Sequence, residues 1–189
     1  MGTISTSQPI IDQAGLFETQ CNWVAAAEWY EKALKAIPGD DFFRSSDFSE
    51  RAGYAFYRAA LQAEKREDFD HRIRAAIEAY EKASGFYTER ASRPRELRSR
   101  AMVSFLKLWL TPDPSERRLQ VRDAWALANE GLQKLYESGD FPEYCRTYNR
   151  IARIPEFAWY YESDAKILEK TLREAVGPYL RARLSGQGR

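Results

Sequence analysis

Two groups of side chains in this sequence could carry out binding or catalysis, and the first is rich in arginine. Four residues are spaced three or four positions apart, so on a helix they would share one face: Arg51, Tyr54, Arg58 and Gln62. Arg95 and Arg98 have similar spacing and could stand beside this stripe. Guanidinium groups bind carboxylates through paired N–H donors, and tyrosine adds rigid contact area. We predict that these six residues bind an acidic partner; the alternative is a solvated helix face with ordinary charge pairs.

The second group is Arg66 and His71, the latter being the single histidine of the chain. Histidine can transfer protons and arginine can bind a phosphate group, which together would suit the cleavage of RNA. The spacing resembles the motif of HEPN-type ribonucleases, and the resemblance implies catalytic roles for both residues. Three acidic residues stand between them within the segment 67–70 and would repel RNA. We therefore favour a histidine in a link between helices, and keep a ribonuclease as the alternative.

A basic strip covers residues 90–100, where five arginines and one glutamate give a local net charge of +4. Such a strip could bind RNA phosphates. The whole chain, however, has 29 basic and 28 acidic residues, so no general attraction to nucleic acid is expected. The arginines would also be distributed around a helix rather than along one side. A protein partner is therefore the prediction, and RNA binding by this strip is kept as part of the alternative.

Cysteine usage and hydropathy exclude several other classes of site. Cys21 and Cys145 stand far apart without a second cysteine or histidine at metal-ligand spacing. We expect neither a disulfide nor a metal site, which fits the reducing cytoplasm. The most apolar run, residues 103–110, is too short for a membrane span and contains Lys107. No motif for a cofactor or a catalytic nucleophile occurs, so we predict a non-enzyme without a cofactor.

Helix start and stop signals predict an all-α chain of about eight helices, and the length of 189 residues predicts one domain, 1–189. Asn22 is the expected N-cap of the second helix, and Asp47 with Glu50 has capping-box spacing for the third. Residues 67–70 are expected to break the chain before the fourth helix. Asp113 before Pro114, and Asp140 shortly before another proline, predict two more N-termini. The last helix could extend to residue 184.

A pattern of alanine, tyrosine and alanine at spacings of four and three occurs twice, at residues 26, 30 and 33 and at 76, 80 and 83. Two small residues around one aromatic residue let a neighbouring helix approach closely, so we expect all six residues in the core. With Pro38 ending the first copy, the pattern resembles the second helix of a tetratricopeptide repeat. Ala14 and Phe17 occupy the positions that the first helix of such a repeat would require.

The resemblance implies antiparallel helical hairpins stacked as an α-solenoid, which the related solenoids of the soluble NSF attachment protein family also form. The best-matching repeat covers residues 7–40, an expanded one 47–89 and a weaker one 93–137, with capping helices over 142–184. The family binds extended segments of other proteins in a concave groove, so the expected function is a non-catalytic scaffold or adaptor. Three adjacent aromatic residues, Trp159, Tyr160 and Tyr161, cannot all share one helix face. Their rings could pack in the core, or one of them could contact a second copy of the chain.

Overall fold

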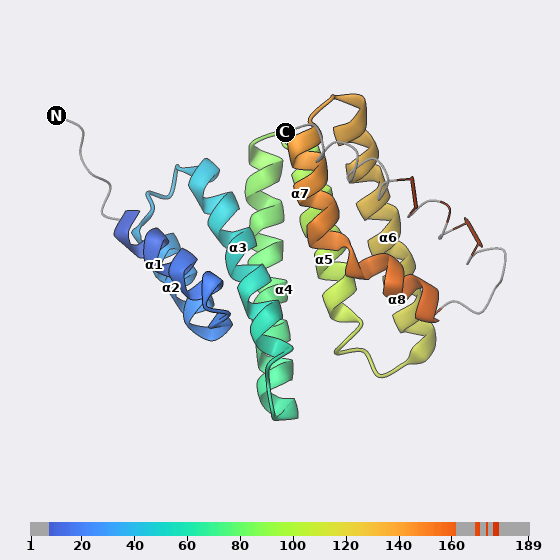
Figure 1. Cartoon of the computed structure of the whole chain (residues 1–189), viewed down its shortest axis with the longest axis horizontal. Coiled ribbons are helices and arrows are strands. Elements are labelled where there is room, and N and C mark those ends of the chain that lie inside the picture. Colours follow the sequence, from blue (N-terminus) through green and yellow to red (C-terminus); the bar gives the residue numbers. More distant parts are fainter. Residues whose placement is uncertain (1–7, 162–168, 171–172, 174–175, 178–189) are drawn as a thin grey trace. The chain divides into compact units, whose positions relative to one another are not determined.

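The computed structural model describes residues 8–161, 169–170, 173 and 176–177, and within these ranges it contains helices and no strand (Figure 1). The all-α prediction is confirmed. The order of elements is α1 (Gln8–Thr19), α2 (Trp23–Ala36), α3 (Phe42–Ala60), α4 (Arg66–Glu89), α5 (Arg93–Lys107), α6 (Pro114–Glu137), α7 (Phe141–Ile151) and α8 (Arg153–Tyr161). Because only Ala152 separates α7 from α8, this pair can also be counted as one interrupted helix. The expected helix end near 184 and the side chains of residues 159–161 lie outside the described residues.

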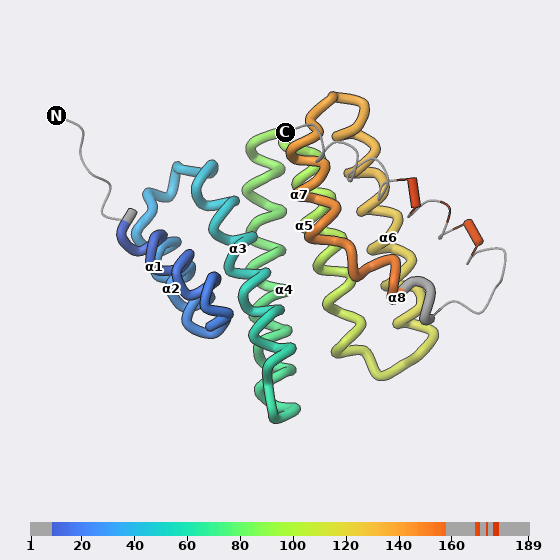
Figure 2. Tube along the Cα trace, viewed as in Figure 1, coloured from blue at the N-terminus to red at the C-terminus, as the bar shows by residue number. Residues whose placement is uncertain are grey.

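The chain divides after Ser92 into two compact units, which we describe separately. Unit 1 contains α1 to α4, and unit 2 contains α5 to α8 (Figure 2). In unit 1, α1 packs on α2, α2 on α3 and α3 on α4. In unit 2, α6 packs on α5, α7 and α8, and α5 also contacts α7. The single domain expected from chain length stays a prediction, since two compact units can belong to one domain.

Three of the predicted helix caps are confirmed, because each depends on residues only two or three positions away. The Asn22 side chain accepts a hydrogen bond from the Ala25 backbone N–H, at 3.3 Å. Asp113 accepts from the backbone N–H groups of Ser115 and Glu116. Asp140 accepts from that of Glu143.

The predicted start of the third helix was wrong. α3 begins at Phe42, and Asp41 is its N-cap, accepting the Arg44 backbone N–H at 3.0 Å. That hydrogen bond and then the Arg44 side chain hold the pKa of Asp41 below its ordinary value. Asp47, the expected cap, lies inside the helix. The capping-box spacing favoured Asp47, because Arg44 rather than a glutamate stands three residues after Asp41, yet residues 42 and 43 already form the first turn of α3.

The predicted break at residues 67–70 was also wrong. α4 begins at Arg66, and its N-cap residue, Lys65, makes no capping hydrogen bond through its side chain. Glu67 and Asp68 stand in the first turn, where the partial positive charge of the helix N-terminus favours carboxylates. The acidic run is therefore a helix start rather than a break.

The recurring alanine and tyrosine pattern lies in the core of unit 1, as predicted. The four alanines are fully buried, and Tyr30 and Tyr80 are at most 1% exposed. The ring of Tyr30 stacks on Phe48 of α3 at 6.2 Å between centroids. Tyr80 lies against Gly53 of α3, where a β-carbon would come within 2.8 Å of the ring. In both copies the aromatic residue of the pattern thus packs against α3, which follows the helix of Tyr30 and precedes that of Tyr80, and the alanines let the backbones approach.

The core of unit 2 combines aliphatic and aromatic side chains. Ala124 and Ala128 of α6 are buried, and Gly131 on the same face lies 3.2 Å, measured from an added β-carbon, from the Pro94 carbonyl oxygen. Phe157 of α8 packs edge-on against Phe105 and Trp109, both at 5.2 Å. Trp125 of α6 is also buried, with 6% of its surface exposed.

Two glycines inside helices of unit 1 should respond oppositely to alanine. Gly53→Ala should lower the free energy of unfolding by about 1–3 kcal/mol, because the new methyl group overlaps the Tyr80 ring. Gly85 in α4 is exposed and has nothing within 4 Å of an added β-carbon. Gly85→Ala should therefore raise stability by about 0.5–1 kcal/mol through helix propensity. Urea denaturation of both variants measures these changes, and equal shifts for the two would contradict the packing described.

Candidate functional site

The predicted stripe lies on the side of α3 that meets α2. Arg51 and Gln62 are exposed, and Tyr54 and Arg58 are half-buried at the edge of the α2–α3 contact. We call these four residues, together with the buried rings of Trp23 and Tyr30 of α2 that the two arginines cover, the arginine–aromatic face. All of its residues belong to unit 1.

Arg58 is held between two aromatic rings. Its guanidinium lies 4.8 Å from the centroid of Trp23 and 5.8 Å from that of Tyr54, and it donates a hydrogen bond to the Tyr54 hydroxyl at 3.0 Å. The two rings meet edge to face at 5.7 Å. Cation–π contacts of this kind orient the cation without neutralising it. Arg58 is therefore a positioned, still positive group.

Arg51 has the same arrangement with one ring. Its guanidinium lies 5.9 Å from the Tyr30 centroid and donates to the Tyr30 hydroxyl at 3.3 Å. Burial raises the pKa of Tyr30 above its ordinary value despite the Arg51 hydrogen bond, so the phenol is neutral near pH 7. Burial opposes the charge of Arg51, but Tyr30 and the nearby carboxylates of Glu18 and Asp47 leave its pKa raised overall. Arg51 is therefore also cationic, with two acids in its surroundings.

The two arginine contacts share one register. Arg51 and Arg58 are seven residues apart on α3, and their partners Tyr30 and Trp23 are seven residues apart on α2 in the opposite order. This is the pattern of two antiparallel helices, in which equal steps along each keep the paired residues opposite. Seven residues correspond to two turns, or about 10.5 Å along the axis. The face thus presents two cations, each over an aromatic ring, at a fixed separation.

Gln62 anchors the end of the face to the α1–α2 turn. Its side-chain amide donates to the Cys21 carbonyl at 3.3 Å. Cys21 has a positive φ of 55°, and the N–H groups of Cys21 and Asn22 bond back to Glu18 and Phe17 at the end of α1. This hydrogen-bond pair is the Schellman arrangement that ends many helices. The sequence predicts that Gln62 contacts a partner, but in the structure its side-chain amide is hydrogen-bonded within unit 1.

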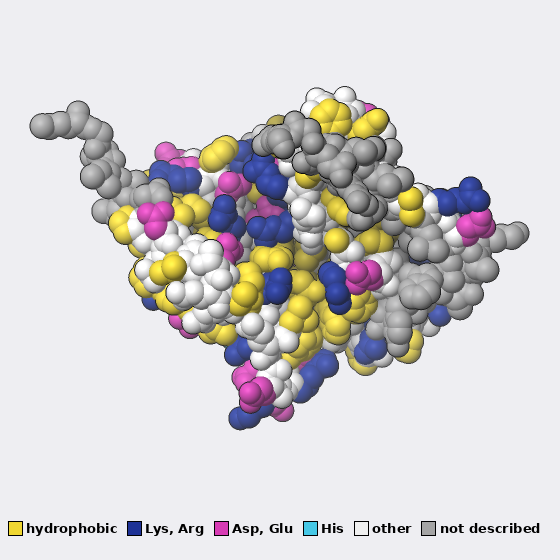
Figure 3. Space-filling model, in the orientation of Figure 1, with side chains coloured by type: hydrophobic (Ala, Val, Ile, Leu, Met, Phe, Trp, Pro, Cys, Tyr) yellow, Lys and Arg dark blue, Asp and Glu magenta, His cyan; other side chains and the backbone are white. Residues whose placement is uncertain are grey.

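Arg51 and Arg58 differ from other arginines of the chain because they contact aromatic rings rather than carboxylates. Among the described residues, no acidic side chain forms an ion pair with Arg51 or Arg58. By contrast, Arg44 pairs with Asp41 and Arg66 with Asp70. In the view of Figure 3, basic side chains over α3 and α4 are interspersed with acidic and hydrophobic ones rather than forming a continuous basic surface.

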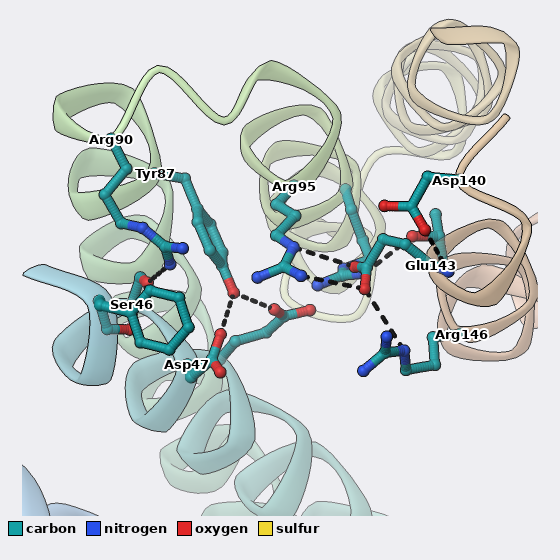
Figure 4. A network of polar contacts seen from close by, with 12 residues as sticks. Ser46, Asp47, Tyr87, Arg90, Arg95, Asp140, Glu143 and Arg146 are labelled. Carbon is teal, nitrogen blue, oxygen red and sulfur yellow. Dashed lines mark hydrogen bonds and ion pairs between the residues drawn. The ribbon is translucent and has the colours of Figure 1, made fainter. Parts of the chain in front are cut away.

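Arg95 and Arg98 belong to unit 2, where they bind Glu143 of α7 (Figure 4). Arg98 Nη1 lies 2.6 Å from Glu143 Oε1 and also donates to Thr147 at 2.8 Å. Arg95 reaches both carboxylate oxygens at 3.2 Å. Arg146 approaches Oε2 at 3.4 Å. We name these residues the Glu143 cluster.

The Glu143 cluster corrects the expectation that Arg98 lies on an exposed binding surface. Arg98 is 5% exposed and Glu143 is 3% exposed, so the ion pair lies inside the unit between α5 and α7. Arg95 retains a 24% exposed side chain. Sequence reasoning missed Glu143 because it stands 45 residues from Arg98 and has no neighbouring signal.

The remaining arginines of the basic strip contact separate partners. Arg90 donates to Ser46 at 2.6 Å and lies over the Phe43 ring, within unit 1 (Figure 4). Arg93 and Arg100 both contact Glu96. These arginines of the strip therefore contribute to local packing and ion pairs.

A buried polar contact between α3 and α4 was not predicted. The hydroxyl of Tyr87, itself fully buried, lies 2.6 Å from Glu50 and 3.2 Å from Asp47 (Figure 4). Asp47 and Glu50, which were predicted to cap the helix, thus accept hydrogen bonds from Tyr87 instead. Burial of a carboxylate requires such a donor.

Arg66 and His71 do not converge. They lie in the first turns of α4, and a step of five residues turns about 140° around a helix, so their side chains diverge. Arg66 pairs with Asp70 at 2.9 Å and lies over Phe69. His71 is exposed. Within one chain, Arg66 and His71 cannot bind the same phosphate group unless the helix rearranges.

Comparison with known proteins gives no family assignment: no family model, curated protein or solved structure matches the chain. Within the described ranges, no cluster of three or more potential metal ligands occurs. Also within those ranges, no helix has the length and hydropathy needed to cross a membrane.

Removing the charge of Glu143 should destabilise unit 2. Glu143→Gln leaves buried Arg98 without its carboxylate, which typically costs about 3–5 kcal/mol for a buried pair. The matched control is Glu130→Gln, since Glu130 contacts Arg93 at 3.6 Å with a 46% exposed side chain and should cost under about 1 kcal/mol. Chemical denaturation measures both. A loss for Glu143→Gln no larger than the control's would contradict a structural role for the cluster.

Proposed function

We propose that this chain is a non-catalytic helical-repeat adaptor that binds an acidic segment of another protein on its arginine–aromatic face. The carrying observation is that Arg51 and Arg58 are held on aromatic rings rather than on carboxylates. A guanidinium over a ring keeps N–H donors available for a carboxylate, and both the cation and the ring have already lost much of their conformational freedom. Arginine and tyrosine in such positions are typical of residues that dominate binding energy.

The arrangement of unit 1 supports a tetratricopeptide-like repeat as the frame for this face. Successive packing of α1 on α2, α2 on α3 and α3 on α4 is what two stacked antiparallel hairpins require. The face includes α3, which the resemblance assigns to the first helix of the second repeat. In that family the first helices line the groove that binds partner segments. The proposal that the helices form a solenoid extends this packing beyond the two hairpins.

An RNA-directed function is the second candidate, and the geometry favours it less. Arg66 and His71 diverge, while the arginines of the basic strip contact Ser46, Glu96 and Glu143 instead of forming one exposed row. Its one support is charge: residues 93–189 contain 18 basic and 13 acidic residues, a net charge of +5, against −4 for residues 1–92. RNA binding, if it occurs, should therefore belong to unit 2.

Capture of partners from a lysate of the natural source tests the function directly. The wild-type chain should retain a stoichiometric protein, and the Arg51→Glu, Arg58→Glu double variant should lose it. The matched control is Arg74→Glu with Lys82→Glu, which makes the same charge change at two exposed positions of α4. Protein and RNA in each eluate are quantified, and circular dichroism confirms that both variants fold.

Two results would contradict the adaptor. Retention of the same protein by the double variant would show that the partner does not bind on the arginine–aromatic face. RNA as the main retained species, together with RNA cleavage that His71→Ala abolishes, would favour the ribonuclease alternative.

A further inference from the structure

The spacing of the two cations on the arginine–aromatic face defines the partner more closely, and this inference rests on the proposed function. Arg58 over Trp23 and Arg51 over Tyr30 are two helical turns apart on both helices. We propose that the face recognises a segment in polyproline II conformation with two acidic residues three positions apart. Each carboxylate would accept hydrogen bonds from one guanidinium.

The conformation follows from matching distances and directions. Seven residues of α-helix rise about 10.5 Å. In a polyproline II segment three residues make one turn and rise about 9.3 Å, so residues i and i+3 point to the same side at nearly this separation. In a β-strand the same-side neighbours i and i+2 lie about 6.7 Å apart, and i and i+4 about 13 Å apart. Of these two extended conformations, only the polyproline II segment brings two side chains to both arginines without distortion.

A helical partner with acids seven residues apart would match the distance but not the surface. A helix packing along α3 needs an apolar stripe to bury. Between the two arginines the face offers Tyr54, half-buried and already bonded through its hydroxyl to Arg58. An extended segment needs no such stripe, because its side chains can contact the arginines while its backbone remains hydrated. The ring of Tyr54 can then pack against a residue between the two acids.

The two arginine positions should not contribute equally. Glu18 and Asp47 lie near Arg51, and their charges compete with an incoming carboxylate. Among the described residues, no acid forms an ion pair with Arg58, which two aromatic rings hold in place. Arg58 should therefore be the stronger contact.

Three proline-rich octapeptides of identical composition and charge test the spacing. Their sequences are Pro-Pro-Asp-Pro-Pro-Asp-Pro-Pro, with the acids three apart, and two isomers with the acids two and four apart. Fluorescence anisotropy of labelled peptides at low ionic strength measures binding to the full chain. The peptide with spacing three should bind about tenfold more tightly than either isomer, since one of the two carboxylates is misplaced in each isomer.

Substitution of the arginines by glutamine completes the test. Arg58→Gln should weaken binding of the spacing-three peptide about tenfold, Arg51→Gln by a smaller factor, and either variant should remove the preference for spacing three. The matched control, Arg74→Gln on α4, should change neither affinity nor preference.

The outcomes separate the spacing rule from the function beneath it. Equal affinity for all three peptides, lost in Arg58→Gln, overturns the rule and leaves an acidic-segment adaptor. Tighter binding of a helical peptide with acids seven residues apart also overturns the rule. Binding that none of the arginine variants changes, or no binding by any acidic peptide, overturns the proposed function as well.

Discussion

The close antiparallel packing of α2 on α3 is the constraint on which the rest of unit 1 depends. Alanines supply the contact on both helices, Ala26 and Ala33 on one and Ala52 and Ala55 on the other, and all four are at most 1% exposed. Small side chains allow the two backbones to approach, and only at that separation can a ring on α2 lie under a guanidinium on α3. The register that buries the alanines is thus the register that pairs Tyr30 with Arg51 and Trp23 with Arg58.

The two units use arginine in different ways. In unit 2, Arg98 and Glu143 neutralise each other inside the structure, and the cluster joins α5 to α7. In unit 1, Arg51 and Arg58 remain at the surface on aromatic rings, which position a cation but leave its charge. A buried ion pair must satisfy its own hydrogen bonds and so has little capacity for a ligand. The difference explains why we assign a structural role to one arginine pair and binding to the other.

Local signals in the sequence predicted much of the fold and part of the site. The helical class, the caps at Asn22, Asp113 and Asp140, and the buried alanine and tyrosine pattern all follow from residues within a few positions of one another. The prediction of a cap at Asp47 was wrong because α3 already begins after Asp41, and the Asp47 carboxylate instead contacts Tyr87, 40 residues away. Periodicity could place Arg51 and Arg58 on one face of a helix.

Periodicity could not predict which aromatic rings these arginines contact, because those contacts depend on how α2 and α3 align. One signal was nevertheless present: Trp23 and Tyr30 have the same seven-residue spacing on the preceding helix. The burial of Arg98 had no comparable signal, since Glu143 lies two helices further along the chain.

Nuclear magnetic resonance of the arginine Nε–H groups during addition of an acidic peptide tests the central claim most directly. In the free protein, the Arg58 signal should be shifted upfield by the ring current of Trp23, because its guanidinium lies 4.8 Å from the ring centroid. Addition of the peptide with two aspartates three positions apart should move the signals of Arg58 and Arg51 together and leave that of Arg74 unchanged. Unshifted signals for Arg51 and Arg58, or equal movement of exposed arginines throughout the chain, would contradict a specific acidic-segment site on this face.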